Sequence, residues 1–409
     1  MYERLRNRTE CVKEEAVEFT QRLVQTPSVS LNEGRVADLV EEKMNELGYD
    51  EVVRDELGNV IGVMFARNAE TTAMLNSHMD TVSAECAEQW EHPPYSGRIE
   101  GDRLYGLGTA DCKAGLAAQI YAGAILKRSL LPLEGNLVVA ATVAEENGRS
   151  IGVNGLLERT LPEMGLRPDY AILGEPTGLG LYYGHDGWAE FEIQIEGANA
   201  FHVDDAAGAI LKEIHPESHL WKTAEQVQSW TIHKPFFEDT EGVRRATIPM
   251  DRRLHQTEDL GEILGQIKHN ARLVAQAAGS VAVDVLVKED NQEMYTGRTT
   301  VVKHVTHAWE TDPFHPIMER SRQALAAAGC TVRPGKFKLD RLGMGTAGSN
   351  LLGQFRVPTI GYGPGLEEAA HSVGEYVELS KITETIYGTA SIIHSLIGMP
   401  VFGWTSDEI

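Results

Sequence analysis

The sequence has few of the features that mark secreted or nucleic-acid-binding proteins. Its 409 residues include only four cysteines, and none of them forms a C-x-x-C pair. This argues against a disulfide framework and against a zinc knuckle. Lys and Arg total 37 against 60 Asp and Glu, which gives a formal net charge of −23. Neither a nucleic acid nor an anionic membrane is therefore an expected partner.

Long apolar runs are also missing. No stretch approaches the roughly 20 apolar residues of a membrane-spanning helix. The N-terminal segment MYERLRNRTECVKEEAVEF is charged throughout and lacks the apolar centre of a signal peptide. We therefore expect a cytoplasmic protein. Its apolar content of 42% and charged content of 24% are those of a globular chain, and its length favours two domains.

Hydrophobic periodicity predicts an α/β domain in the first part of the chain. Apolar strands alternate with helices there, which is typical of a sheet covered on both faces. The Ala-rich segment at 113–129 has helical spacing and is expected to be buried. Further helices are expected at 10–25, 34–47 and near 152–159, and strands at 59–66, 71–80, 136–146 and 169–176.

The pattern changes near Gly187. WAEFEIQIEG (188–197) alternates apolar and polar residues, as a strand with one solvent face should. A β-α-β-α-β unit follows from this strand, a helix-like stretch at 207–231, a strand at 246–254, a helix at 257–276 and a strand at 280–287. The α/β pattern then returns, with a strand near 357–365 and a helix at 382–398. We predict one domain in two parts, 1–186 and 296–409, interrupted by an inserted α+β domain at 187–295.

Potential metal ligands gather at the predicted strand ends. His78 and Asp80 lie two positions apart in LNSHMDTV (75–82), so both side chains point the same way if a strand ends there. Similar places, at strand ends or in the turns after them, are occupied by Asp111, Glu145, Glu146, Glu175 and His371. Ligands of an open α/β sheet bind beyond the carboxyl ends of its strands. We therefore expect these loops to converge.

Two imidazoles with several carboxylates and no thiolate suit a pair of divalent ions, zinc first, with cobalt or manganese as alternatives. Ions about 3.5–4 Å apart need a bridging carboxylate, and another carboxylate must stay free to accept a proton. Glu145 and Glu146 can divide these roles because consecutive side chains point different ways. Each residue alone also has a simpler explanation. Asp111 can be a helix cap, Glu175 part of a turn and His371 a surface residue.

Two other motifs point elsewhere. GMGTAG (343–348) matches the G-x-G-x-x-G of an NAD-dependent dehydrogenase, and Glu367 follows about 20 residues later. However, no buried strand is predicted before it. The segment HVTHAWETDPFH is interpreted as surface between the domains, and it contains His304, His307, Glu310 and His315. The H-E-x-x-H motif does not occur in the chain.

Taken in order, SHMDTV, GTADCKAG, AEENG, GEPT and AHSVGEYV resemble the dinuclear-zinc aminoacylase and carboxypeptidase G family. That family includes acetylornithine deacetylase and succinyl-diaminopimelate desuccinylase. The resemblance implies a zinc-peptidase-like catalytic domain with a central mixed sheet, and an inserted ferredoxin-like lid through which a homodimer forms. It also implies a two-metal hydrolase that cleaves an amide bond of an N-acyl amino acid or a small peptide.

The resemblance also implies the metal ligands. His78 and Glu175 would bind one ion, Glu146 and His371 the other, and Asp111 would bridge them. The peptide bond after this bridging aspartate is expected to be cis.

Three further roles follow from the same resemblance. Asp80 would orient His78, Glu145 would be the general base, and His202 in EGANAFHV would reach the substrate carbonyl across the dimer. Arg253 in MDRR fits a D-x-R pattern of a lid strand. The chain departs from the family in the short VDDAAGAI after His202, in Ala347 of GTAGSN and in lacking the lid's Asn-x-Ile-Pro. These departures concern substrate recognition, and they leave a metal-binding homologue without hydrolytic activity as an alternative.

Overall fold

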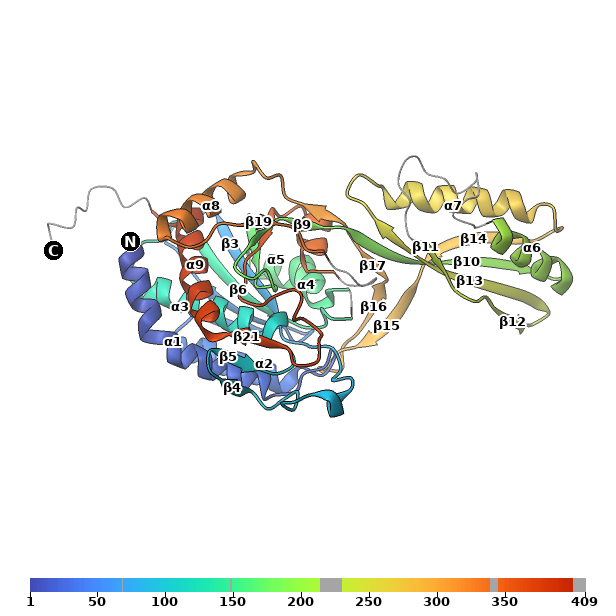
Figure 1. Ribbon diagram of the computed structural model, residues 1–409. Coiled ribbons are helices and arrows are strands. Elements are labelled where there is room, and N and C mark those ends of the chain that lie inside the picture. Colours follow the sequence, from blue (N-terminus) through green and yellow to red (C-terminus); the bar gives the residue numbers. More distant parts are fainter. Residues whose placement is uncertain (68, 148, 214–229, 339–344, 400–409) are drawn as a thin grey trace.

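The computed structural model describes residues 1–67, 69–147, 149–213, 230–338 and 345–399 (Figure 1). Its largest element is an eight-stranded mixed sheet. The neighbouring pairs β6–β3, β3–β7 and β7–β20 are parallel, whereas β1–β2 and β2–β6 are antiparallel. In sheet order, the strands are β1 (Glu51–Arg54), β2 (Val60–Met64), β6 (Asn136–Thr142), β3 (Thr72–His78), β7 (Tyr170–Leu173), β20 (Thr359–Gly361), β8 (Leu181–Tyr182) and β19 (Pro334–Gly335).

Both faces of this sheet are buried. In β3, Leu75 joins one apolar core and Met74 joins the other, and in β6 Val139 and Val138 separate in the same way. Successive side chains of a strand point to opposite faces, so a continuous apolar run produces this arrangement. One core includes α1 (Tyr2–Val24), α2 (Gly34–Leu47), α3 (Ala114–Arg128), α8 (Pro316–Ala328) and α9 (Leu379–Ile397). The other includes residues of α4 (Ile151–Gly155), η3 (Leu156–Thr160), α5 (Leu161–Glu163) and η4 (Ser349–Gln354).

A second sheet has its own apolar core. Its long strands β10 (Gly187–Gly197) and β13 (Val243–Leu254) pair antiparallel along their whole length. Alternate residues of β10, Phe191, Ile193 and Ile195, are buried with α6 (Ala200–Glu213) and α7 (Leu260–Ala275). The remaining strands are β14 (Ala282–Val287), β11 (Trp230–Ile232), β12 (Phe236–Thr240) and β17 (Val305–Thr306). Figure 1 shows this unit extending to one side of the large sheet. The arrangement is the predicted α/β domain with an α+β insertion.

The predicted helix at 207–231 is partly wrong. Helix α6 begins earlier, at Ala200, because the side chain of Asn199 accepts a hydrogen bond of 3.0 Å from the N–H of Phe201 and so supports the first turn. Residues 230–232 form strand β11 rather than helix. The intervening residues 214–229 lie outside the described part of the chain.

A hairpin that the sequence pattern does not predict connects the two sheets. It consists of β15 (Glu289–Glu293) and β16 (Thr299–Lys303). At its tip, the Tyr295 hydroxyl donates to the Gly58 carbonyl at 2.9 Å. The predicted domain limit at 295/296 falls in this turn, and the limits 1–186, 187–295 and 296–409 stay a prediction. Among the described helices, none is long and apolar enough to cross a membrane.

His304 is buried rather than at the surface, contrary to the prediction. Its side chain is nearly inaccessible, with Nδ1 2.7 Å from Glu190 on β10 and Nε2 2.9 Å from Asp290 on β15. His315 has a local role, because its Nδ1 accepts a hydrogen bond from the N–H of Ile317 at the start of α8. These histidines therefore have structural partners.

Candidate metal centre

Asp111 lies between two histidines. Its Oδ1 is 3.1 Å from Nε2 of His78, and its Oδ2 is 3.5 Å from Nε2 of His371. Glu175 lies on the first side, 3.9 Å from Nε2 of His78, and Glu146 lies on the second, 2.8 Å from Nε2 of His371. The structure therefore contains two sets of possible ligands that share Asp111. Within each set, the candidate ligand atoms all lie within 4.8 Å of one another.

Parallel strands bring these residues together. His78 is the last residue of β3, Glu146 follows the end of β6, and Glu175 follows the end of β7. The carboxyl ends of parallel strands lie at one edge of a sheet, which is where ligands bind in α/β folds. Asp111 comes from the loop before α3, and His371 from turns between β20 and β21 (Tyr376–Glu378).

Asp111 is not a helix cap. The residue preceding α3 is Lys113, and no side chain caps this helix by a hydrogen bond. Asp111 has non-helical backbone angles, φ −128° and ψ 97°. Its peptide bond to Cys112 is cis, as expected. The alternative explanation of Asp111 as a cap is therefore wrong.

Asp80 contacts His78 mainly through its backbone. Nδ1 of His78 lies 2.9 Å from the Asp80 carbonyl oxygen and 3.6 Å from its carboxylate. A donating Nδ1–H leaves Nε2 unprotonated and able to bind a metal. The Asp80 carboxylate itself accepts hydrogen bonds from the N–H groups of Glu145 (3.1 Å) and Glu146 (2.9 Å), and from the Ser30 hydroxyl (2.7 Å). Asp80 thus supports both the imidazole and the turn after β6.

Glu145 is buried beside the ligand sets but belongs to neither. Its Oε1 accepts a hydrogen bond of 3.2 Å from the Ser150 hydroxyl. Burial, with the charges of Glu146, Asp80 and Asp111, raises the pKa of Glu145 to about 8. A carboxyl whose pKa lies near neutral pH can accept a proton and release it again.

The ligand sets concentrate negative charge away from water. Burial, and then the charge of Asp111, raise the pKa of both Glu146 and Glu175. Burial opposes ionisation of Asp111 too, but the hydrogen bond and charge of His78 and the charge of His371 lower its pKa. Burial lowers the pKa of His371, but Glu146 and Asp111 outweigh it and raise that pKa to about 9. Buried carboxylates in this number need cations, so the donor set fits two divalent ions.

Cys112 belongs to the first group by distance, because its Sγ lies within 4.8 Å of candidate ligand atoms of His78, Asp111 and Glu175. Its Sγ accepts a hydrogen bond of 3.3 Å from the N–H of His78. Burial raises the pKa of this thiol, so it stays protonated. We therefore interpret Cys112 as a support for the end of β3 rather than as a ligand.

Among the described residues, buried charged side chains next to the turns that carry the candidate ligands include three that were not predicted, namely Glu33, Lys113 and Glu375. The Glu33 carboxylate accepts a hydrogen bond of 2.9 Å from the N–H of Ala144, the residue before Glu145. The Nζ of Lys113 donates to two carbonyls near the end of α1, both at 2.9 Å. Lys113 and Glu375 lie inside the motifs GTADCKAG and AHSVGEYV. Their positions in these motifs could therefore have identified them as residues near the centre. Glu33 stands in a loop that carries no recognisable pattern.

His202 does not lie at this centre within one chain. It occupies the first turn of α6, beside Gly279, and belongs to neither ligand set. Figure 1 shows α6 on the inserted unit, well away from β3. Arg253 lies on β13, paired in register with Trp188.

The described part of GMGTAG does not resemble a dinucleotide site. The N–H of Thr346 donates to Nε2 of His185 at 2.9 Å, and Nε1–H of Trp309 donates to the Thr346 hydroxyl at 3.2 Å. The segment then enters the short helix η4. A dinucleotide motif instead joins a buried strand to the start of a full helix. Residues 343 and 344 lie outside the described part of the chain.

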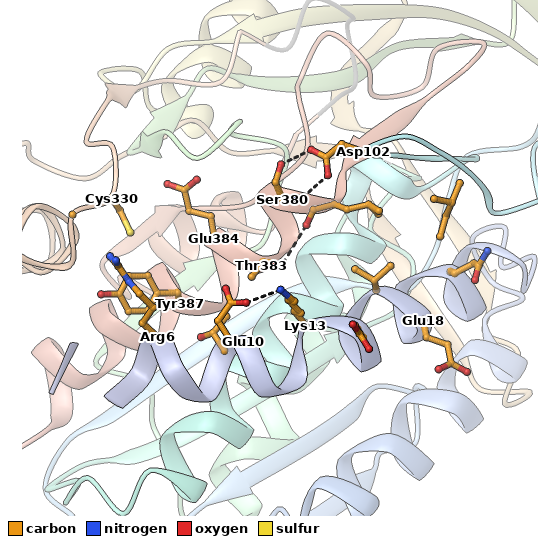
Figure 2. Close-up of a pocket in the computed structure, with 17 residues that line it drawn as sticks. Arg6, Glu10, Lys13, Glu18, Asp102, Cys330, Ser380, Thr383, Glu384 and Tyr387 are labelled. Atoms are coloured by element: carbon orange, nitrogen blue, oxygen red, sulfur yellow. Dashed lines mark hydrogen bonds and ion pairs between the residues drawn. The ribbon is translucent and has the colours of Figure 1, made fainter. Parts of the chain in front are cut away.

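A groove of about 900 Å³ lies elsewhere, between α1 and α9 (Figure 2). Glu10 and Lys13 of α1 face Ser380 and Glu384 of α9 across it, and Lys13 is paired with Glu10 at 2.6 Å. None of the candidate ligands lines this groove. It is therefore separate from the metal centre.

The α/β fold and the two ligand sets that share one carboxylate define the class of a dinuclear metal-dependent hydrolase. The model of Peptidase family M20/M25/M40 matches residues 74–395. Because the match spans most of the chain, the protein belongs to this family. The predicted family resemblance and enzyme class, a metal-dependent amidohydrolase or metallopeptidase, are thereby confirmed.

Individual proteins are similar to this chain over different lengths. The chain is 28% identical to YgeY, an uncharacterized protein of Escherichia coli (strain K12), over 370 residues, which is 87% of this chain and 88% of YgeY. It is 30% identical to succinyl-diaminopimelate desuccinylase 2 of Ruegeria sp. over 165 residues, which is 40% of this chain and 41% of the relative. The structure of the Bacillus subtilis YXEP protein, a dinuclear metal-binding peptidase from the M20 family, matches with a TM-score of 0.67 at 15% identity, covering 95% of this chain and 99% of YXEP. This structural likeness confirms the predicted fold class.

Proposed function

We propose that the protein is a two-metal hydrolase that cleaves the amide bond of an N-acyl amino acid or a small peptide. The observation that carries the proposal is the position of Asp111, with one carboxylate oxygen toward each histidine. In the proposal, His78 and Glu175 would bind one ion, Glu146 and His371 would bind the other, and Asp111 would bridge them. Zinc is the first candidate, with cobalt and manganese as alternatives.

The chain's own residues supply the proton transfers. Divalent ions in this site would polarise the amide carbonyl and lower the pKa of bound water toward about 7. Glu145 accepts the proton of the attacking water and then passes it to the leaving amine. Three features support this role. Its carboxylate lies outside both ligand sets, Ser150 holds one of its oxygens, and Asp80 holds its backbone N–H.

The inserted unit, with proposed limits 187–295, would act as a lid and as the surface of a homodimer. We propose that His202 of one subunit donates a hydrogen bond to the substrate carbonyl oxygen in the other. Apolar residues exposed on the helices of this unit support an interface, since Phe201 on α6 is 74% exposed and Leu273 on α7 is 46% exposed. A cytoplasmic location belongs to the same proposal.

The substrate class is supported by the names of similar proteins. A desuccinylase removes an acyl group from an amine, and a peptidase cleaves an amide between amino acids. Both reactions need an activated water and a polarised carbonyl, which is the chemistry that the ligand sets can provide. The departures of GTAGSN and VDDAAGAI from the family pattern bear on which acyl group and amino acid fit.

The test is a substrate screen on protein of defined metal content. The protein is stripped with a chelator and reloaded separately with zinc, cobalt or manganese, and bound metal is measured by elemental analysis. N-formyl, N-acetyl and N-succinyl amino acids and dipeptides are then assayed for release of free amine. We expect two metals per chain and turnover of at least one substrate class. Two bound metals without turnover would instead favour a non-hydrolytic metal-binding protein, and no bound metal would overturn the proposed site.

A further inference from the structure

Glu375 is a fully buried carboxylate, 0% exposed, that accepts three backbone hydrogen bonds from one loop. Its Oε1 accepts the N–H groups of Ala110 at 2.7 Å and Asp111 at 3.1 Å. Its Oε2 accepts the N–H of Gly108 at 3.0 Å. Both oxygens are therefore used to hold the loop that carries Asp111.

We propose that Glu375 is a positioning residue that sets the orientation of the Asp111 carboxylate between the two metals. The inference rests on the proposed function, because it assigns a support to the proposed bridging ligand. Glu375 stands four residues after His371 in the sequence. One short segment thus supplies a candidate ligand of one ion and the support for the ligand that both ions share.

The loop needs such a support because its backbone is irregular. Gly108 has a left-handed φ of 83°, and Asp111 has non-helical angles. The N–H groups that bond to Glu375 therefore cannot be satisfied by an ordinary helix, and a buried N–H without a partner is destabilising. On the other side of the loop, Lys113 is bound to the end of α1 through the Leu23 carbonyl. The loop is thus held from two directions, and Glu375 contacts the part that includes Asp111.

The size of the expected effect follows from how metal sites respond to lost supports. Removing a group that orients a ligand typically weakens metal binding by about 10- to 100-fold. Glu375→Gln keeps the shape of the side chain but replaces one accepting oxygen with an NH₂ donor. Whichever way the amide is placed, that donor faces at least one backbone N–H. We therefore expect Asp111 to shift without loss of the fold.

The experiment is a cobalt titration of the full-length, metal-stripped protein. For Glu375→Gln we expect Co²⁺ affinity to fall by about 10- to 100-fold, with a changed visible absorption spectrum of the bound cobalt. Hydrogen exchange of the metal-free proteins provides a second measurement. In the wild type the amides of Gly108, Ala110 and Asp111 should exchange slowly, and in the variant they should exchange faster. The affinity and spectrum report on ligand geometry, which general destabilisation would leave unchanged.

Leu325→Ala is the matched control, because Leu325 is fully buried in α8 and belongs to neither ligand set. This variant should lose thermal stability but keep wild-type cobalt affinity and spectrum. If Glu375→Gln is insoluble, the same cobalt titration is done with Glu375→Asp. This side chain keeps the charge but is too short to reach all three N–H groups, so we again expect a lower Co²⁺ affinity and a changed spectrum. A soluble Glu375 variant with wild-type affinity and spectrum would overturn the positioning role alone. A wild type that does not bind two metals would overturn the proposed function as well.

Discussion

Oδ1 of Asp111 lies 3.1 Å from Nε2 of His78. A second histidine lies at the other oxygen, so the carboxylate belongs to a candidate cation site rather than to a helix terminus. We therefore expect the negative charge of Asp111 to decide whether metal binds. Its ability to accept a hydrogen bond from a helix should not matter.

We predict that Asp111→Asn binds at most one metal tightly and is nearly inactive. Asparagine removes the negative charge that compensates two dications held about 3.5–4 Å apart. In the presence of a chelator the variant should unfold at nearly the wild-type denaturant concentration. Asp169→Asn is the control for the loss of one carboxylate charge away from the centre, because Asp169 accepts a hydrogen bond from the N–H of Thr72 at the opposite end of β3. Two tightly held metals in Asp111→Asn by elemental analysis would contradict the bridging role.

Glu145 and Glu146 should respond differently to the same substitution. Glu145→Gln should keep two metals but lose about 10²- to 10⁴-fold in kcat, since a positioned general base contributes this much. Glu146→Gln should instead lose metal, because Glu146 contacts His371 within a ligand set. Metal analysis and steady-state kinetics on both variants separate the roles. An active Glu145→Gln enzyme would remove Glu145 as the base.

The proposed dimer can be tested by mixing two inactive variants. In a hybrid of His202→Ala and Glu145→Gln subunits, one of the two sites has both an intact His202 and an intact Glu145. Random exchange at equal concentrations should therefore restore roughly a quarter of wild-type activity. Native mass spectrometry would verify that the subunits exchange. Exchange without any recovery of activity would show that His202 does not act across the interface.

His185 should make the protein less stable at acidic pH. Its Nδ1–H donates to the Asp186 carbonyl at 2.7 Å, and its Nε2 accepts the N–H of Thr346, so only the neutral imidazole fits. Burial lowers the pKa of His185 to about 4 from the ordinary value of 6.5. The unfolded chain therefore takes up this proton first as pH falls. Neutral His185 therefore makes its full contribution to the free energy of unfolding above about pH 6.5. This contribution is lost progressively as the pH falls toward 4.

Between pH 7 and pH 5, the protonation of His185 should lower the free energy of unfolding by roughly 2 kcal/mol. Urea unfolding of the wild type and of His185→Gln at both pH values measures it. The glutamine variant cannot be protonated, so its stability should depend less on pH than that of the wild type by about that amount. Equal pH dependence in the two proteins would show that His185 is not the group responsible. Metal-free samples avoid a contribution from ligand binding.

Much of the candidate centre follows from local sequence patterns. The apolar runs that end at His78, before Glu145 and before Glu175 predicted three strands, and these strands are parallel neighbours in the large sheet. Their carboxyl ends coincide for a geometric reason, so residues of ligand type at predicted strand ends are enough to indicate a site. The residues at which helices begin and end were less predictable. Helix α6 starts at Ala200 because of a side-chain contact to Asn199 that periodicity does not reveal.

The sequence by itself determined the kinds of candidate ligand, their order along the chain and the periodicities that place them at strand ends. Only the tertiary structure decided which groups hold those ligands in position. Asp80 reaches His78 through a backbone carbonyl, and Glu375 reaches the Asp111 loop from a segment 264 residues away. The physical reason is that irregular ligand loops leave buried N–H groups without helix or strand partners. Carboxylates from distant segments accept hydrogen bonds from these N–H groups. Such long-range contacts produce no repeating pattern in the local sequence.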